Sequence, residues 1–220
     1  MSIFEELRQM TTEHAMLRGV GAVLHSPRFY DAIVWFALQG RERRMRQRLL
    51  DLSRIRVGES VLDVGCGTGT LAILAKKIVG LSGAVCGVDP SPEMLVRASA
   101  KAARAGVEVR FENAVAQALP FADSSFDLAL STMMLHHLGR AARWALAAEM
   151  RRVVRVGGRA LIVDFAKPAG KRRGAHFRHR HGHVDLGEIA GLLEGTGFSS
   201  LESGAVGIKS LQFVLAARQS

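Results

Sequence analysis

A glycine-rich turn between a short apolar run and an amphipathic helix constrains this chain most. The run Val61-Leu62-Asp63-Val64 leads into three glycines, Gly65, Gly67 and Gly69, and apolar residues then recur at helical spacing. Strand, glycine turn and helix in this order open a nucleotide-binding βαβ unit. The glycines let the backbone approach a ligand closely, and the helix N-terminus offers unpaired N–H groups. The stretch predicts an α/β fold with a ligand site at the turn.

The spacing of the glycines argues against a dinucleotide. The dinucleotide fingerprint G-x-G-x-x-G/A needs its third small residue where this chain has Thr70. Asp63 lies inside the strand just before the turn, where its charge would repel a pyrophosphate. A ligand with a positive charge and one carboxylate suits this turn better.

Strand and helix candidates alternate along the rest of the chain. Further strands are expected at residues 84–88, 107–111, 126–130, 160–165, 198–202 and 210–216, with a Gly157-Gly158 turn before the fourth of them. Helices are expected at 2–18, from Pro27, after the prolines at 90 and 92, at 140–154 and at 184–193. This alternation predicts a doubly wound, mostly parallel sheet preceded by N-terminal helices.

Length and composition predict one soluble globular domain. The chain has 220 residues, 48% of them hydrophobic, and no apolar run of the roughly 18 residues that a membrane span needs. Two cysteines without a disulfide or metal spacing indicate a reducing, cytoplasmic location. The net charge of +10 favours anionic partners but does not separate nucleic acid, an acidic small molecule and a membrane surface.

Four local patterns carry a family resemblance. They are VLDVGCGTG, GVDPSPEML, ALPFADSSFDLALS and VVRVGGRALIVDF, and they span residues 61 to 165. In this order they resemble the class I S-adenosylmethionine-dependent methyltransferases. The phrases LPF…FD and LHHL resemble the small-molecule branch that contains quinone-biosynthesis C-methyltransferases. The resemblance implies a Rossmann-like seven-stranded sheet ordered 3-2-1-4-5-7-6 with the last strand antiparallel. It also implies S-adenosyl-L-methionine as cofactor and in-line methyl transfer to a small molecule.

The resemblance assigns cofactor roles at the strand ends. Gly65, Gly67 and Gly69 would form the floor under the amino-acid part of the cofactor, and Asp63 would orient its ammonium group. Asp89 ends the second strand about 20 residues past the turn, where an acid accepts hydrogen bonds from ribose hydroxyls.

The other implied contacts surround the adenine and the sulfonium. Pro90 and Met94 would wall one side of the adenine, and Ala116 would offer its backbone N–H to a ring nitrogen. Ser131 would lie beneath the sulfonium, and Tyr30 would close over the cofactor. The position before Ala116 is Val115, where the family usually has an acid, so one hydrogen bond to the adenine amino group is missing.

Paired histidines follow the fourth strand. His136 and His137 are candidates for a general base that removes a proton from an oxygen or carbon acceptor. The same pair recurs in this branch with unrelated substrates, so a structural role stays open beside the catalytic one.

A second histidine group lies in the basic stretch 167–183. His176, His179, His181 and His183 stand among Lys and Arg residues with no acid before Asp185, so no metal site is expected. A basic substrate lid that favours an anionic acceptor is the preferred interpretation.

The resulting division has four parts within a single domain: a helical lid at 1–56, a cofactor-binding core at 57–166, the basic loop at 167–183, and a C-terminal helix and strands at 184–220. Five arginines between residues 41 and 48 indicate a solvated helix face, although one of them could turn inward to the cofactor carboxylate. Two alternatives remain open. A nucleic-acid methyltransferase is disfavoured, because neither an Asn/Asp/Ser-Pro-Pro-aromatic run nor a catalytic cysteine is found, and a non-catalytic cofactor-binding module is the other. The sequence leaves the acceptor atom and the oligomeric state open.

Overall fold

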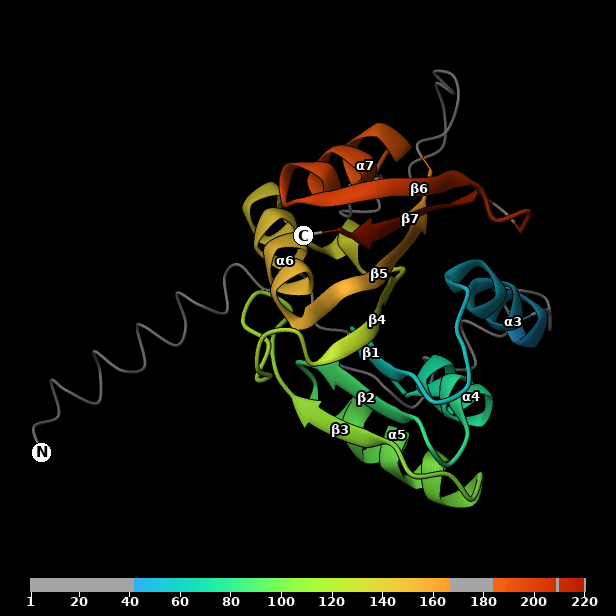
Figure 1. Cartoon of the computed structure of the whole chain (residues 1–220). Helices are drawn as coiled ribbons and strands as arrows, with labels where there is room; N and C mark the ends of the chain where they lie inside the picture. Colours follow the sequence, from blue (N-terminus) through green and yellow to red (C-terminus); the bar gives the residue numbers. More distant parts are fainter. Residues whose placement is uncertain (1–41, 167–183, 209, 220) are drawn as a thin grey trace, which may run out of the picture.

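The computed structural model describes residues 42–166, 184–208 and 210–219. In this part of the chain seven strands form one sheet in the order β3-β2-β1-β4-β5-β7-β6 (Figure 1). The strands are β1 Ser60–Val64, β2 Ala84–Asp89, β3 Arg110–Asn113, β4 Phe126–Thr132, β5 Val154–Phe165, β6 Phe198–Ala205 and β7 Leu211–Arg218. The pairs among β1 to β5 are parallel, whereas β7 runs antiparallel to β5 and β6. The predicted strand order and antiparallel last strand are confirmed.

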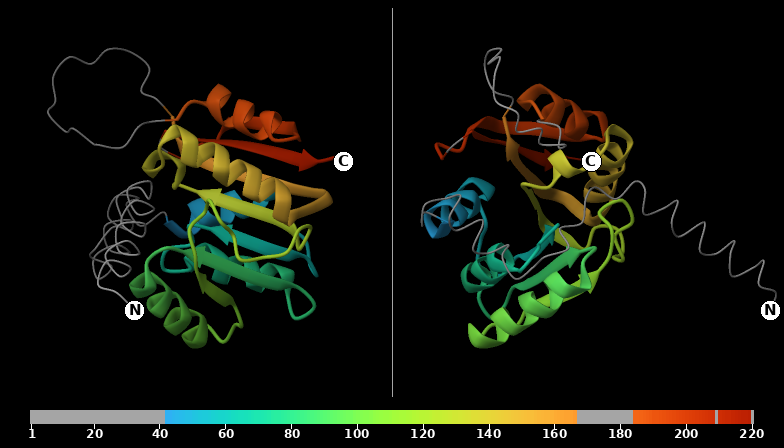
Figure 2. Two further views of the ribbon diagram at one scale, coloured as in Figure 1. Left: turned by 90° about the vertical axis from the view of Figure 1, so that its left-hand side faces the viewer. Right: turned by 180° about the vertical axis from the view of Figure 1, so that it is seen from behind.

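Helices cover both faces of this sheet, as Figures 1 and 2 show. They are α3 Glu42–Ser53, α4 Thr70–Val79, α5 Pro92–Arg104, α6 Arg140–Val153 and α7 Leu186–Gly195, with a 3₁₀ turn, η1, at Leu135–His137. Successive strand residues point to opposite faces. Val61 therefore packs in one core cluster with α3 and α4, and Leu62 packs in the other with α6 and α7. The helices predicted at 2–18 and from Pro27 lie outside the described residues.

Two strands begin elsewhere than predicted. β3 starts at Arg110 rather than Val107, because the backbone N–H groups of Gly106 and Val107 are used in closing the end of α5 on Ala103 and Ala102. The predicted turn before β5 is wrong as well. Phe126 pairs with Val154 and Leu128 with Arg159, so the two glycines form a bulge inside one long strand.

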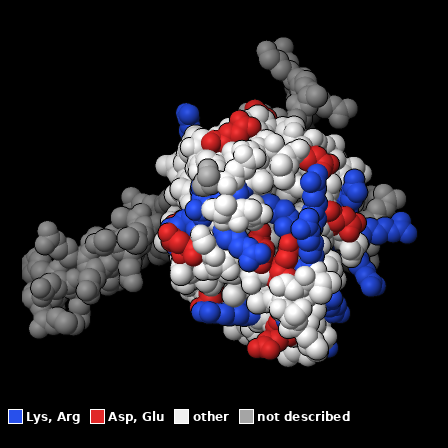
Figure 3. All heavy atoms as spheres, in the orientation of Figure 1, with Lys and Arg blue, Asp and Glu red and all other residues white. Residues whose placement is uncertain are grey.

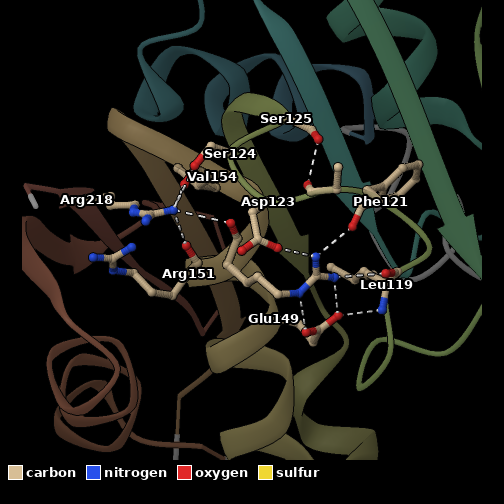
Figure 4. Close-up of polar contacts among 11 residues, drawn as sticks. Leu119, Phe121, Asp123, Ser124, Ser125, Glu149, Arg151, Val154 and Arg218 are labelled. Atoms are coloured by element: carbon tan, nitrogen blue, oxygen red, sulfur yellow. Dashed lines mark hydrogen bonds and ion pairs between the residues drawn. The ribbon is translucent and has the colours of Figure 1, made fainter.

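The LPF pattern has a structural role, because it docks the loop before β4 onto α6 (Figure 4). The Arg152 guanidinium donates to the backbone oxygens of Leu119 and Phe121, at 2.9 and 2.6 Å, and pairs with Glu149 and Asp123. Glu149 in turn accepts from the N–H of Leu119 at 2.7 Å. Hydrogen bonds from Arg152 lower the pKa of the Glu149 carboxyl against the opposing effect of burial.

Arg159, a buried arginine, joins β5 to the end of α3 and to Glu59, the residue before β1. Arg159 in β5 donates to the backbone oxygens of Ser53 and Arg54 at the end of α3, and its two terminal nitrogens each lie 2.8 Å from a carboxylate oxygen of Glu59. Burial alone would raise the pKa of Glu59, but the hydrogen bonds from Arg159 and the Arg56 N–H bring it below the usual value. The pair thus holds α3 against the sheet.

We expect Arg159→Met to lower the free energy of unfolding by about 3 kcal/mol, because the half-buried Glu59 carboxylate and two backbone oxygens lose the guanidinium that donates to them. The exposed pair Arg54–Glu202 offers the control: Arg54→Ala should cost less than about 1 kcal/mol. Urea unfolding measures both. Since the folded pKa of Glu59 is lowered from 4.5, the Arg159 contribution is present above pH 4.5 and is lost as the pH falls further. Equal effects of the two substitutions would contradict this role.

Candidate functional site

The glycine turn lies at the carboxyl end of β1 and can hold little but glycine. Gly65 and Gly69 have φ of +75° and +74°. A Cβ on Gly69 would lie 2.8 Å from the side chains of Ala98 and Phe111, and one on Gly65 would lie 2.7 Å from Cγ of Met134. The N–H of Gly65 also donates to the backbone oxygen of Val88 at 2.9 Å, which joins the turn to β2. The turn is a fixed surface of bare backbone at the edge of the sheet.

Asp63 is buried beneath this turn with only 2% of its surface exposed. Its Oδ1 has no hydrogen-bond partner among the described residues. Burial raises the pKa of Asp63 to about 7 and the charge of Asp89 acts in the same direction, while Arg46 and the N–H of Ala72 lower it. A buried carboxyl with unused acceptor capacity is prepared for a cationic donor.

One arginine of the run in α3 turns inward, as the sequence allowed. Arg46 is buried at 6% exposure, whereas Arg43, Arg44 and Arg48 on the same helix are exposed, as predicted for a solvated face. Its positive charge acts on Asp63. Asp63 and Arg46 thus carry opposite charges that act on one another, and such a pair matches the two charges of a zwitterionic amino-acid group. A contact of Arg46 with the cofactor carboxylate stays a prediction.

Asp89 is the last residue of β2 and reaches back to the glycine turn. Its Oδ2 accepts from the N–H of Gly67 and its Oδ1 from the N–H of Ser91, both at 2.9 Å. Burial raises the pKa of Asp89, and these two hydrogen bonds oppose the shift. Each carboxylate oxygen has a further lone pair, so the group can still accept from two hydroxyls. Near it, Pro90 is exposed and Met94 is buried.

The remaining candidate positions are distributed along the same edge. Ala116 is half-buried in the segment after β3 and packs against the core. Ser131 lies near the end of β4, fully buried, and its Oγ has no hydrogen-bond partner among the described residues. Tyr30 lies outside the described residues.

The histidine pair forms η1 directly after β4. The rings of His136 and His137 lie 4.0 Å apart between centroids. His136 Nδ1 is 2.7 Å from Oδ1 of Asp164, which is the penultimate residue of β5 and has no exposed side-chain surface. The sequence interpretation missed Asp164. The signal was available: like Asp63 and Asp89, it is an acid at the carboxyl end of an apolar strand.

Comparison with known proteins shows the family to which the chain belongs. The pattern of a family described as "Methyltransferase domain" matches residues 61–158. A demethylmenaquinone methyltransferase of Thermus thermophilus is 34% identical over 166 residues, which cover 76% of this chain and 74% of that protein. The chain belongs to the S-adenosylmethionine-dependent methyltransferase family.

The match covers a smaller part of other relatives. A ubiquinone/menaquinone biosynthesis C-methyltransferase of Bdellovibrio bacteriovorus is 35% identical over 150 residues, 68% of this chain but only 62% of that protein. The chain thus spans about three fifths of such relatives. Among solved structures, a SAM-dependent methyltransferase from Aquifex aeolicus has a TM-score of 0.67 at 24% identity, covering 79% of this chain and 89% of its own. The [4+2]-cyclase SpnF has a TM-score of 0.71 at 17% identity, covering 91% and 87%. These two establish the methyltransferase fold alone.

The described residues were compared with the predictions about metal binding and membrane spans. The described part of the chain holds no group of three His, Cys, Asp or Glu residues arranged to bind a metal ion, and the histidines at 176–183 lie outside it. Within the same residues no helix is long and apolar enough to cross a membrane.

The raised pKa of Asp63 predicts a pH-dependent stability. Because its pKa rises from 3.8 to about 7 on folding, Asp63 does not lower the stability of the free protein below pH 3.8, lowers it progressively between pH 3.8 and 7, and has its full destabilising effect above pH 7. We expect Asp63→Asn to unfold at a higher temperature than the wild type at pH 8 and at the same temperature near pH 4. Asp51→Asn, at an exposed position, is the control. If the unfolding temperatures of wild type and Asp63→Asn depend on pH in the same way, the charge of the Asp63 carboxylate is already balanced in the free protein and this prediction is wrong.

Proposed function

We propose that this protein transfers a methyl group from S-adenosyl-L-methionine to a small-molecule acceptor. The observation that carries the proposal is the pair of strand-end carboxylates, Asp63 and Asp89, on either side of a turn of bare backbone. The two acids differ in what they lack: Asp63 has a buried oxygen with no hydrogen-bond partner in the part of the chain that the structure describes, and Asp89 has spare lone pairs near the surface. A cation and a diol at a fixed separation would complete them, and the cofactor offers an ammonium group and a ribose.

The chain's own residues would mainly bind and align. Asp63 and Arg46 match the charges of the amino-acid group, and Gly65, Gly67 and Gly69 leave room for it. Asp89 accepts from the ribose. The adenine and sulfonium contacts proposed from the sequence are Pro90, Met94, Ala116, Ser131 and Tyr30. When bound, the cofactor supplies an activated methyl group. The protein then has to hold the acceptor about 3 Å from the methyl carbon, opposite the sulfur, and exclude water.

A small-molecule acceptor is favoured over nucleic acid. The curated relatives are named for quinones, which are small molecules. On the face in Figure 3, Lys and Arg side chains alternate with Asp and Glu rather than forming one basic stripe, the usual footprint of nucleic-acid binding. A module that binds the cofactor without methyl transfer is the remaining alternative, since a protein named as a cyclase has the same fold. We further infer a reducing, cytoplasmic location from the free thiols of Cys66 and Cys86.

Titration calorimetry with S-adenosyl-L-methionine and with its demethylated product tests the cofactor site. We expect wild type to bind both, and Asp89→Ala to bind at least roughly 30-fold more weakly, which is about 2 kcal/mol, because two hydroxyls lose a charged acceptor. The exposed acid Glu108 provides the control, and Glu108→Ala should leave the affinity within about twofold. No binding of either ligand by wild type at millimolar concentration would refute the proposal.

We also propose that the acceptor is anionic. Phe165 and Val184, which flank the basic stretch, belong to the part of the molecule next to Asp164: Phe165 is its neighbour in β5, and the backbone oxygen of Val184 accepts from Gln212, the residue paired with Asp164 in β7. The stretch itself has six Lys or Arg between Lys167 and Arg180 and no acid. Its location in the sequence supports a role at the rim of the acceptor site.

Neutralising four arginines of this stretch tests the charge of the acceptor. Replacing Arg172, Arg173, Arg178 and Arg180 by Gln should raise KM for an acceptor found by screening and leave the cofactor affinity within about twofold. Steady-state kinetics and calorimetry measure the two quantities. A loss of cofactor affinity would place the stretch in the cofactor site. No change in either KM or cofactor affinity would mean that the stretch belongs to neither the acceptor site nor the cofactor site.

A further inference from the structure

His136 is held by a buried carboxylate at two points. Its Nδ1 lies 2.7 Å from Oδ1 of Asp164, and its backbone N–H donates to Oδ2 of the same residue at 3.1 Å. One side chain therefore fixes both the backbone and the ring of His136. Of the two histidines in η1, the hydrogen bonds to Asp164 single out His136.

The bonds around Asp164 determine which ring nitrogen of His136 carries the proton. Asp164 is fully buried, and Oδ1 also accepts from the N–H of Phe165 at 2.7 Å. Each carboxylate oxygen thus already accepts a backbone N–H. An ionised carboxylate can only accept, so the ring atom that faces it, Nδ1, has to be the donor. In the neutral imidazole the lone pair then lies on Nε2, the nitrogen on the far side of the ring.

Packing also fixes the His136 ring, at the end of the sheet where the glycine turn lies. The Phe165 ring meets His136 edge-on at 5.3 Å between centroids, and the His137 ring lies at 4.0 Å, tilted by 41°. Two residues before His136, the Met134 side chain lies against Gly65. His136 therefore has a defined ring orientation close to the glycine turn, with 14% of its side chain exposed.

We propose that Asp164 is a positioning residue that sets His136 as the general base, and that the acceptor is a hydroxyl or an acidic C–H rather than an amine. This inference rests on the proposed function. The acceptor oxygen or carbon forms a bond to the methyl carbon while the C–S bond breaks and its electron pair stays on sulfur. The acceptor proton moves to Nε2, and the imidazolium is stabilised by Asp164 until the proton leaves to solvent. A neutral amine already has a nucleophilic lone pair and would not need this arrangement.

Nitrogen NMR on the full chain with ¹⁵N-labelled histidine tests the arrangement without turnover. His136 is assigned by the loss of its signals in His136→Gln. We expect Nδ1 protonated and Nε2 unprotonated in the neutral ring of wild type, and a loss of this preference in Asp164→Ala. His137→Gln should leave the His136 tautomer unchanged. A neutral His136 protonated on Nε2 in wild type would overturn the proposal even if no Asp164 variant folds.

Kinetics on the acceptor then tests its chemical class. For a hydroxyl or carbon acceptor, Asp164→Ala should lower kcat by about 100-fold or more, with the cofactor Kd and the acceptor KM within about threefold. Asp51→Asn, at an exposed position away from the site, should leave all three unchanged. An amine acceptor, or a kcat that Asp164→Ala does not change, would overturn the inference and leave methyl transfer standing. A chain that does not bind the cofactor refutes the proposed function instead, whatever the tautomer of His136.

Discussion

Asp63, near the end of β1, carries a buried negative charge that its surroundings compensate only in part. The arrangement of the other groups at the carboxyl ends of the strands depends on this charge. Helices on both faces exclude water from β1, so the carboxylate cannot be solvated. Arg46 opposes its charge from α3, while Asp89 adds to it from β2. A chain selected for stability alone would have an apolar residue here, as it has at Leu62 and Val64. Strain of this kind is characteristic of a ligand site.

Asp63, Asp89 and Asp164 each lie within the last two residues of a parallel strand, and each is satisfied differently. Asp63 in β1 has an oxygen without a hydrogen-bond partner among residues 42–166, 184–208 and 210–219, Asp89 in β2 supports the glycine turn, and Asp164 in β5 holds His136. The first two lie where a cofactor would bind and the third lies next to the candidate base. Parallel pairing brings the carboxyl ends of these strands to the same end of the sheet, so the topology places the proposed cofactor contacts and the proposed base at different points along that end.

Sequence was sufficient where the determining signal was local or belonged to a known family. The glycine turn, the acids at 63 and 89 and the histidine pair were visible as short patterns, and the strand order came from the resemblance. Sequence was insufficient where a distant contact decides. The bulge in β5 depends on pairing with β4, and the start of β3 depends on how α5 closes. The role of Asp164 depends on a partner 28 positions away, and the choice of Arg46 among five arginines depends on how α3 packs.

Proton release on cofactor binding tests the central claim most directly. Titration calorimetry of S-adenosyl-L-methionine at pH 7, in two buffers with different ionisation enthalpies, counts the protons exchanged. With the pKa of Asp63 at about 7 in the free protein, a bound ammonium should force ionisation and release about half a proton, and Asp63→Asn should release none. Binding with the same proton count in wild type and in Asp63→Asn would contradict the account, because Asp63 would then not meet the charge of the cofactor.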